Sequence, residues 1–274
     1  MSVRPALQGT EVTSVTGTKS KRKLAWHATS ALERGLADGG CPVCRSLQRA
    51  VRRYIFSFLY EGMMSGSARE TFLKGGGFCR EHFWQAKNIE AECWADGFGV
   101  AILCENLLVR CQDEVKQLPE SKPEKKPTLL GFSTRPRRQP AILGLTPGSG
   151  CTVCAVQKES ENHYVAVLEE LLEDADFSRR YQHSAGLCFS HLGAAAGQWQ
   201  SSIALQVIKS TANRAVRELI ADLREFQRKH DYQYRHEPRE LESTSPQRAI
   251  QFLVGLKADM DGAPEAPTTQ RKRR

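Results

Sequence analysis

The stretch that decides the fold reads Cys41-Pro42-Val43-Cys44 and is completed, 34 residues later, by Cys79-Arg80-Glu81-His82. The same pattern recurs as Cys151-Thr152-Val153-Cys154 and, after 33 residues, Cys188-Phe189-Ser190-His191. Each CxxC and CxxH pair together supplies three thiolates and one imidazole, which is a complete ligand set for one tetrahedral zinc ion. The eight candidate metal ligands are Cys41, Cys44, Cys79, His82, Cys151, Cys154, Cys188 and His191.

The spacing inside each pair places its two donors on one helical turn. Residues at i and i+3 share a helix face, so a pair that opens a helix presents both ligands together. The free N–H groups and positive dipole end of a helix N-terminus also stabilise a thiolate. Pro42 suits a first helical position, and Gly77 and Gly186 permit a tight turn just before the second pairs. We therefore expect each metal where two helix starts converge.

Zinc is the metal that this ligand set favours, with two ions expected per chain. Four protein ligands leave no coordination position for water or substrate, so both sites are predicted to be structural. An iron–sulfur cluster is the alternative cofactor, although such clusters are usually held by four cysteines. Thiol redox chemistry at Cys41 and Cys44 is a further alternative, but the pattern lacks the βαβ context of thioredoxin-like proteins.

The sequence leaves open which CxxC joins which CxxH. Each metal is bound either within one half of the chain or by the CxxC of one half and the CxxH of the other. The short separation inside each half favours the local arrangement, in which Cys41 and Cys44 join Cys79 and His82.

A proline-rich segment divides the chain into two similar halves. Six prolines punctuate residues 119–150, and closely spaced prolines cannot continue a helix. A shift of 110 residues lays the first CxxC on the second, and a one-residue deletion then aligns the CxxH pairs. The predicted organisation is a disordered tail (1–23), a first helical repeat unit (24–118), a proline-rich basic linker (119–150), a second repeat unit (151–230), a C-terminal segment with a short helix (231–260) and a basic disordered tail (261–274).

Apolar residues recur at steps of three and four, for example between Leu47 and Leu59 and between Leu205 and Phe226. We expect each unit to contain a helix that opens at CxxC, a short helix, a helix that opens at CxxH and a long closing helix. A last helix is expected from Pro246 to Lys257, with Ser245 as its cap. The predicted fold is all-α, with two tandem repeat units, each closed by a Cys3His metal site, packed as one pseudo-symmetric body.

The formal net charge of +8 is concentrated outside the repeat units, at 19–23, 122–138 and 271–274. This distribution favours solvated basic segments over a nucleic-acid interface, which stays a weaker alternative. No apolar run approaches the roughly 18 residues of a membrane helix, and no secretory signal is recognised. We therefore expect a cytoplasmic protein without membrane contact. Six of its nine cysteines are expected to bind metal, and no disulfide framework is expected.

No catalytic constellation is recognised, because the chain lacks a Gly-x-Ser-x-Gly elbow, a phosphate-binding glycine loop and a dinucleotide fingerprint. No catalytic residue is therefore predicted. Cys93, Cys104 and Cys111 are interpreted as buried structural thiols, and Trp84 as a core residue. The acidic run from Glu169 to Asp176 is interpreted as a solvated helix end.

The motifs CPVC (41–44), GFCREHFW (77–84), CTVC (151–154) and GLCFSHL (186–192) resemble those of a bacterial family of unknown function with tandem CPxC and GFCxxH pairs. The late segment RAIQFLVG (248–255) is similar as well, and the resemblance spans 24–256 apart from the linker. It implies a helical fold and a metal-binding role for the eight matched residues, and no activity. Thr152 and Leu187 depart from the family pattern in the second copy.

These features favour a zinc-stabilised binding or adaptor protein with an unidentified protein partner. The alternative is a redox-responsive protein in which an iron–sulfur or zinc–thiolate centre senses oxidant. A third hypothesis is nucleic-acid association through the basic linker and tails.

Overall fold

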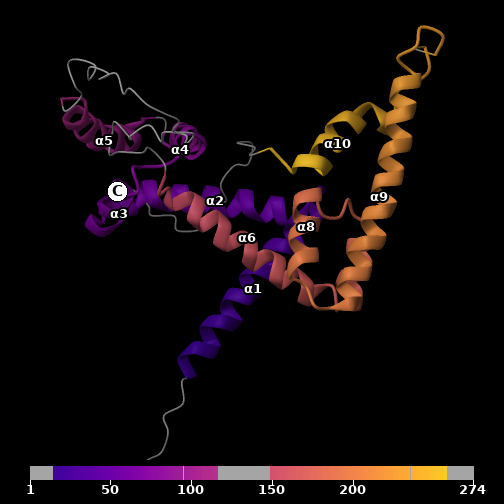
Figure 1. Cartoon of the computed structure of the whole chain (residues 1–274), viewed down its shortest axis with the longest axis horizontal. Helices are drawn as coiled ribbons and strands as arrows, with labels where there is room; N and C mark the ends of the chain where they lie inside the picture. Colours follow the sequence, from indigo (N-terminus) through magenta and orange to yellow (C-terminus); the bar gives the residue numbers. More distant parts are fainter. Residues whose placement is uncertain (1–14, 95, 117–148, 235, 258–274) are drawn as a thin grey trace, which may run out of the picture. The chain divides into compact units, whose positions relative to one another are not determined.

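The computed structural model describes residues 15–94, 96–116, 149–234 and 236–257, and within these ranges it contains helices and no β-strand. The predicted all-α class is confirmed (Figure 1). In chain order the elements are α1 (Val15–Ala37), α2 (Pro42–Tyr60), η1 (Gly62–Met64), α3 (Gly66–Lys74), α4 (Arg80–Cys93), α5 (Phe98–Lys116), α6 (Thr152–Leu171), α7 (Ala175–Gln182), α8 (Phe189–Gln198), α9 (Ser202–Arg228), η2 (Leu241–Thr244) and α10 (Ser245–Val254).

Four helices begin at the metal-ligand motifs, as the spacing predicts. Helices α2 and α6 start directly after Cys41 and Cys151, and α4 and α8 start directly after Cys79 and Cys188. A short helix and a long helix complete the expected order in each half. Most of the linker at 119–150 and the whole tail at 261–274 lie outside the described residues.

Helix α1 is the main local difference from the sequence prediction. It begins at Val15, inside the stretch 1–23 that was expected to be a disordered tail. From Trp26 on, where the burial of its side chains is described, α1 buries Ala28, Ala31 and Leu32. Residues 15–23 read VTGTKSKRK and carry no apolar period from which a helix is predicted. Helix α10 also includes Ser245 as its first residue and ends at Val254 rather than Lys257.

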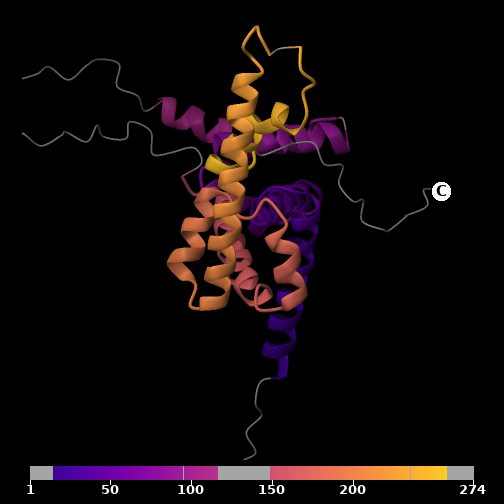
Figure 2. The same cartoon turned by 90° about the vertical axis from the view of Figure 1, so that its right-hand side faces the viewer.

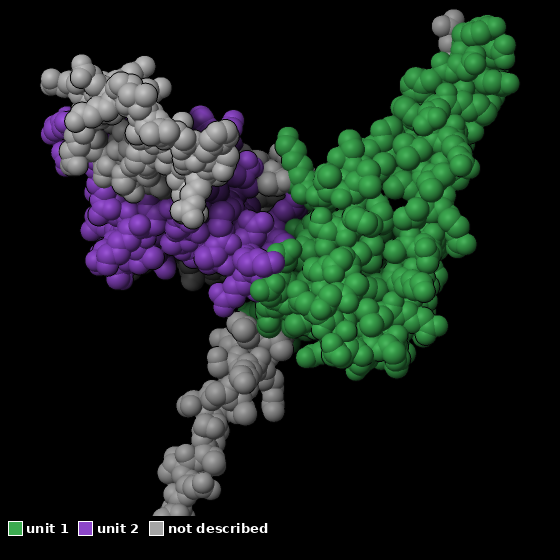
Figure 3. Space-filling model, in the orientation of Figure 1, with its two compact units in different colours: residues 1–46, 161–257 green, residues 47–160, 258–274 purple. Residues whose placement is uncertain are grey.

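The described residues divide into two compact units (Figure 3). Unit 1 contains residues 15–46 and 161–257, and unit 2 contains residues 47–116 and 149–160. Each unit thus combines segments from both halves of the chain, and the divisions fall inside α2 and α6. These compact units differ from the tandem repeat units 24–118 and 151–230, and the pseudo-symmetric packing stays a prediction.

In unit 1 the long helix α9 is the central support. It packs against α7, α8, η2 and α10, and α10 also contacts α8 (Figures 1 and 2). Unit 1 buries Leu32, Leu168, Phe177 and Tyr181 completely or almost so. These side chains come from α1, α6 and α7, so N-terminal and C-terminal segments share one core.

In unit 2 the core is an aromatic cluster. The ring centroids of Phe58, Phe72 and Phe78 lie 4.9–5.7 Å apart in tilted and edge-to-face arrangements. Such pairs add to the stabilisation from burial of their apolar surface. Ile55 and Leu103 complete the buried centre of this cluster.

Acidic side chains fix several helix starts. Asp174 caps α7 by accepting hydrogen bonds from the backbone N–H groups of Asp176 and Phe177, so part of the acidic run has a capping role. Glu169 accepts from the N–H groups of Gln200 and Ser201, just before α9. Asp174 thus satisfies donors in the first turn of α7, and Glu169 satisfies the N–H groups of the N-cap residue of α9 and of the residue before it.

Two predictions about individual side chains are wrong. Trp84 is 63% exposed on α4 and is not a core residue. Cys93, Cys104 and Cys111 are half-buried rather than buried. Within the described ranges, no helix has both the length and the apolar character needed to cross a membrane.

Candidate metal centres

The structure gathers the eight predicted ligands into two groups of four. Site 1, in unit 1, consists of Cys41, Cys44, Cys188 and His191. Site 2, in unit 2, consists of Cys79, His82, Cys151 and Cys154. All ligand atoms of one group lie within 4.8 Å of one another. No predicted ligand is left out.

The preference for local pairing within each half was wrong. Each site takes its CxxC from one half of the chain and its CxxH from the other. The separation between the two pairs of site 1 is 144–150 residues, against 38 from Cys41 to Cys79. Loop-closure entropy grows only by about 0.6 kcal/mol for each doubling of length, so two doublings cost about 1 kcal/mol. Tertiary packing easily outweighs such a small term.

The distances in site 1 are those of a closed cluster. The Nδ1 atom of His191 lies 3.4 Å from the Sγ atoms of Cys41 and Cys44 and 3.2 Å from that of Cys188. The Sγ atoms of Cys44 and Cys188 are 3.8 Å apart.

Site 2 repeats this geometry. The Nδ1 atom of His82 lies 3.2 Å from the Sγ of Cys79, 3.5 Å from that of Cys151 and 3.4 Å from that of Cys154. The Sγ atoms of Cys79 and Cys154 are 3.6 Å apart. All nine cysteines of the chain are free thiols.

Both groups fit one tetrahedral zinc ion. Two sulfurs bonded to zinc at about 2.3 Å lie about 3.8 Å apart, and a sulfur and an imidazole nitrogen lie about 3.5 Å apart. The observed sulfur–sulfur distances of 3.6–3.8 Å and sulfur–nitrogen distances of 3.2–3.5 Å match these edges. Each imidazole presents Nδ1 to the sulfurs, so its Nε2 faces away from the cluster.

Helix starts position the ligands, as the sequence predicts. Site 1 lies at the N-termini of α2 and α8, and site 2 at those of α4 and α6. Cys79 and Cys188 are the N-cap residues of α4 and α8, with extended backbone conformations. Helix N–H groups and dipoles therefore favour negative charge on the sulfurs in both sites.

Two glycines shape the turns before the CxxH pairs. Gly77 and Gly186 have φ angles of +83° and +70°, a region that favours glycine. A Cβ on Gly77 would lie 2.6 Å from Cδ1 of Leu107, and one on Gly186 would lie 3.1 Å from Cγ2 of Thr211. The predicted requirement for glycine is confirmed at both positions.

Site 1 has polar support that the motif does not include. Nε2 of His191 lies 3.2 Å from a carboxylate oxygen of Glu161 on α6. A carboxylate behind a metal-bound histidine fixes the ring and raises its basicity. The hydroxyl of buried Tyr181 accepts a hydrogen bond from the N–H of Leu187, next to the ligand Cys188.

The C-terminal segment covers site 1. Gly255 directly follows α10 with a φ angle of +86°. A Cβ placed on it would lie 3.2 Å from the Sγ of Cys44 and 3.8 Å from that of Cys188. The backbone at Gly255 therefore approaches the sulfurs more closely than most side chains would permit.

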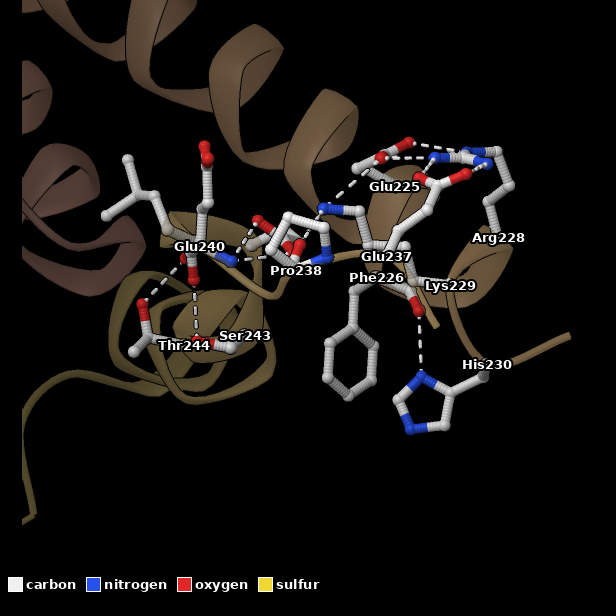
Figure 4. Close-up of polar contacts among 12 residues, drawn as sticks. Glu225, Phe226, Arg228, Lys229, His230, Glu237, Pro238, Glu240, Ser243 and Thr244 are labelled. Carbon is white, nitrogen blue, oxygen red and sulfur yellow. Dashed lines mark hydrogen bonds and ion pairs between the residues drawn. The ribbon is translucent and has the colours of Figure 1, made fainter. Parts of the chain in front are cut away.

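A polar clasp holds α9 to the segment that precedes α10 (Figure 4). Lys229 donates hydrogen bonds to the carbonyl of Pro238 at 2.7 Å and to the carboxylate of Glu242 at 2.9 Å. Arg228 pairs with Glu225 and Glu237. Lys229 and Glu242 are both buried, so each supplies the charge that the other needs.

The two sites differ in exposure. In site 1, Cys41, Cys188 and His191 are buried, and Cys44 is 9% exposed. In site 2, His82 and Cys151 are buried, but Cys79 is half-buried and Cys154 is exposed. The sulfur atoms of site 2 are therefore more exposed to solvent than those of site 1.

The thiols and imidazole of site 1 share their protons unevenly. Burial raises the pKa of the Cys41 thiol well above its usual value, and hydrogen bonds to Cys188 and Cys44 raise it further. Hydrogen bonds from Cys41, Cys44 and His191 hold the pKa of Cys188 far below its usual range. Burial lowers the pKa of His191, but contacts with Cys188 and Cys44 outweigh burial and raise it to about 10. A metal cation would displace these protons, since thiolates and neutral imidazole are its ligands.

Comparison with known families gives one match. Residues 29–260 match the model of a family of unknown function, DUF6062. The chain belongs to this family. The resemblance seen in the motifs is therefore confirmed, and the matched range contains all eight ligands and Gly255. Comparisons with curated proteins and with solved structures give no match.

Sequence reasoning missed Glu161, Tyr181 and Gly255. Glu161 lies ten residues after Cys151 but contacts the histidine of the other CxxH pair, so only the crossed arrangement reveals it. Gly255 had one usable signal, because it ends the RAIQFLVG segment on which the family resemblance partly rests. Tyr181 aligns with Phe72 when the second CxxH is laid on the first, which hides its polar role.

Proposed function

We propose that this protein is a binding or adaptor protein whose fold is held together by two structural zinc ions, one in each Cys3His site. The observation that supports this proposal is the set of ligand distances, which match the edges of a zinc tetrahedron in both sites. Four protein ligands fill such a shell, so the metals serve structure rather than catalysis.

Zinc would be held at site 1 by Cys41, Cys44, Cys188 and His191, and at site 2 by Cys79, His82, Cys151 and Cys154. When bound, it supplies positive charge that keeps the thiolates together. Each ion would join a segment from the first half of the chain to one from the second. Zinc binding contributes about 10–16 kcal/mol in small zinc-finger peptides, comparable to the whole stability of a domain.

Elemental analysis of the purified protein, together with its visible spectrum, tests the metal. We expect about two zinc per chain and no colour. Iron with a brown absorbance would replace this proposal with an iron–sulfur protein. Little metal of either kind would refute the central inference.

The binding role follows from the coordination of the metals, because a site with four protein ligands has no free position for a substrate. If the metals are structural, function lies in surfaces that the metals hold in shape. We propose a protein partner in the cytoplasm, and affinity purification from cells with zinc-loaded protein tests it. A partner that is lost with the double variant Cys41→Ser/Cys44→Ser, but retained with Cys104→Ser, would support this role.

A redox-responsive centre is the second candidate function, and the exposure of Cys154 is the observation that favours it. Oxidation would join two thiolates in an S–S bond, with both electrons passing to a peroxide, which takes up two protons and becomes two water molecules. Metal release at sub-millimolar peroxide would favour this function, whereas metal retention would count against it. Nucleic-acid association stays a prediction, because most of the basic residues behind it lie outside the described ranges.

A further inference from the structure

Unit 1 contains a pocket beside site 1 that the metal sites do not explain. Its volume is about 320 Å³, at the small end of the range for ligand pockets. Four segments line it, namely residues 40–41 just before α2, the stretch from His183 to Cys188, the middle of α9 and residues 248–252 of α10. Cys41 and Cys188 form part of its wall, so a ligand here would lie against metal-ligating residues.

Apolar side chains give the pocket a hydrophobic part. Leu187, Ala215, Leu219 and Phe252 line it. Leu187 is held in place because its backbone N–H is bonded to the hydroxyl of Tyr181. An apolar ligand body would be transferred from water to these side chains, which favours binding by about 25 cal/mol per Å².

Two arginines give the pocket its polar part. Arg214 and Arg248 line it from α9 and α10, with Glu218 as the only carboxylate among the lining residues. Glu218 is already paired with Arg214 at 2.6 Å. Arg248 is ion-paired as well, with Asp222, but this carboxylate does not line the pocket. Arg248 is nevertheless the arginine that can bind a ligand, because part of its guanidinium can still donate hydrogen bonds.

The guanidinium of Arg248 is fixed before any ligand binds. Its Nη2 atom bonds a carboxylate oxygen of Asp222 at 2.7 Å, and its Nε bonds Oγ1 of Thr244 at 3.1 Å. Both N–H groups on Nη1 have no partner among the described residues. A guanidinium held in one orientation loses little conformational entropy when it binds a carboxylate.

We infer that this pocket binds a small organic carboxylate with an apolar body, through Arg248 and the apolar wall. The inference gives the proposed binding function a ligand class. It rests on that function only in so far as site 1 must be intact to form the wall. The ligand's carboxylate would accept hydrogen bonds from Nη1 of Arg248, and its hydrocarbon part would contact Leu219 and Phe252.

Three linear probes of six carbon atoms each test the head group. Hexanoate, hexylamine and hexan-1-ol are titrated into the full-length, zinc-loaded protein, and backbone amide NMR shifts are followed. We expect hexanoate to bind at least tenfold more tightly than hexylamine and several-fold more tightly than hexan-1-ol. The largest shifts are expected at residues 184–188, 214–219 and 248–252. Equal affinity for the three probes, tighter binding of hexylamine, or shifts located elsewhere would overturn the inference.

Variants test the location independently. Ala215→Phe fills the pocket and should abolish hexanoate binding, and Arg248→Met should lower the affinity at least tenfold, to the level of hexan-1-ol. Arg217→Met, on the exposed side of α9 and outside the pocket, is the matched control and should change nothing. If folded Ala215→Phe protein, with unchanged metal content, still binds hexanoate, the inference is wrong. If Arg248→Met does not fold, the three-probe comparison on the unaltered protein decides.

The metal content separates this inference from the proposed function. Hexanoate binding to a chain that carries no zinc would sustain the pocket and refute the structural zinc. Zinc-loaded protein that does not bind hexanoate would support the structural zinc and refute the ligand pocket.

Discussion

Site 1 and site 2 each contain three cysteines and one histidine in similar geometry, but their surroundings differ. In site 1 the sulfurs are buried, Glu161 supports His191, and Gly255 covers Cys44. In site 2, Cys154 is exposed and Cys79 is half-buried. When the two halves of the chain are aligned on their metal-ligand motifs, Glu161 corresponds to Val51 and Tyr181 corresponds to Phe72. Among the described residues, no carboxylate contacts the imidazole of His82 in the way that Glu161 contacts that of His191.

This difference separates two properties of a metal site. The motif fixes which atoms bind, and the surrounding packing fixes how easily solvent, chelators and oxidants reach them. Mutation of a residue that hydrogen-bonds to a metal ligand typically lowers metal affinity by about 10–100-fold. We therefore expect site 1 to hold zinc more tightly and to release it more slowly than site 2.

The largest expected effect comes from removing the ligands that join the two halves of the chain. The double variant Cys41→Ser/Cys44→Ser should lower the zinc content from two to one. Unit 1 should then lose stability of the order of a whole domain, about 5–15 kcal/mol. Hydrogen exchange should show lost protection in α7–α10 and retained protection in α4 and α5.

Cys104→Ser is the matched control, because Cys104 is half-buried and belongs to neither site. Loss of protection centred on α4 and α5 in the double variant would instead mean that Cys41 and Cys44 pair with Cys79 and His82. That outcome would refute the crossed arrangement.

Removing the carboxylate behind His191 should bring site 1 closer to site 2. Glu161→Gln keeps the shape of the side chain and removes its charge, so zinc affinity at site 1 should fall by about tenfold or more. Competition with a chromophoric chelator measures this change. Glu170→Gln, an exposed position on the same helix, should leave the affinity unaltered. Equal affinities for both variants would show that Glu161 does not support the metal.

Oxidation should distinguish the two sites by the access of peroxide to sulfur. Hydrogen peroxide should release the first zinc about tenfold faster than the second, because exposed thiolates react before buried ones. Peptide mapping by mass spectrometry should find the first disulfide among Cys79, Cys151 and Cys154. A first disulfide between Cys41 and Cys44 would contradict the predicted order.

A side chain at Gly255 should loosen the cover of site 1. Gly255→Ala places a Cβ 3.2 Å from the Sγ of Cys44, and its positive φ adds strain of about 1–3 kcal/mol. Gly39→Ala isolates the strain, because Gly39 has a φ of +75° and no heavy atom within 4 Å of the added Cβ. Zinc release from site 1 should be faster in Gly255→Ala than in Gly39→Ala. Identical release rates would mean that the Gly255 segment does not protect the metal.

The smallest expected effect concerns the Lys229–Glu242 pair, which holds the segment before α10 to α9. The hydrogen bond from Lys229, with a further one from the backbone of Glu240, lowers the pKa of Glu242 to about 2. A carboxyl whose pKa is lowered by folding stabilises the protein above its ordinary pKa of about 4.3, and this contribution is lost as the pH falls towards 2. Glu242→Gln should lower the melting temperature at pH 7.

The difference in melting temperature between Glu242→Gln and the unaltered protein should shrink as the pH falls from 4.5 to 2.5. Scanning calorimetry of the two proteins side by side at each pH measures it, because metal loss at low pH affects both proteins alike and cancels in the difference. Glu240→Gln, at an exposed carboxylate nearby, serves as the control. A difference that is constant over this pH range would exclude the ion pair as its cause.

The sequence by itself determined the ligands, the helical class and the helix starts. CxxC and CxxH at helix N-termini are local patterns, because their geometry depends on residues within one helical turn and not on the tertiary packing. The glycines at 77 and 186 were predictable for the same reason, since each serves the turn beside its own motif. Helix α1 was only partly predictable, because its first nine residues carry no apolar period.

Only the tertiary structure decided how these parts combine. The crossed pairing, Glu161 behind His191 and Gly255 over Cys44 all join residues far apart in the chain. The entropy difference between local and crossed closure is about 1 kcal/mol, too small to choose between them. The choice belongs to the two cores, each of which buries side chains from both halves of the chain, and no single half contains that information.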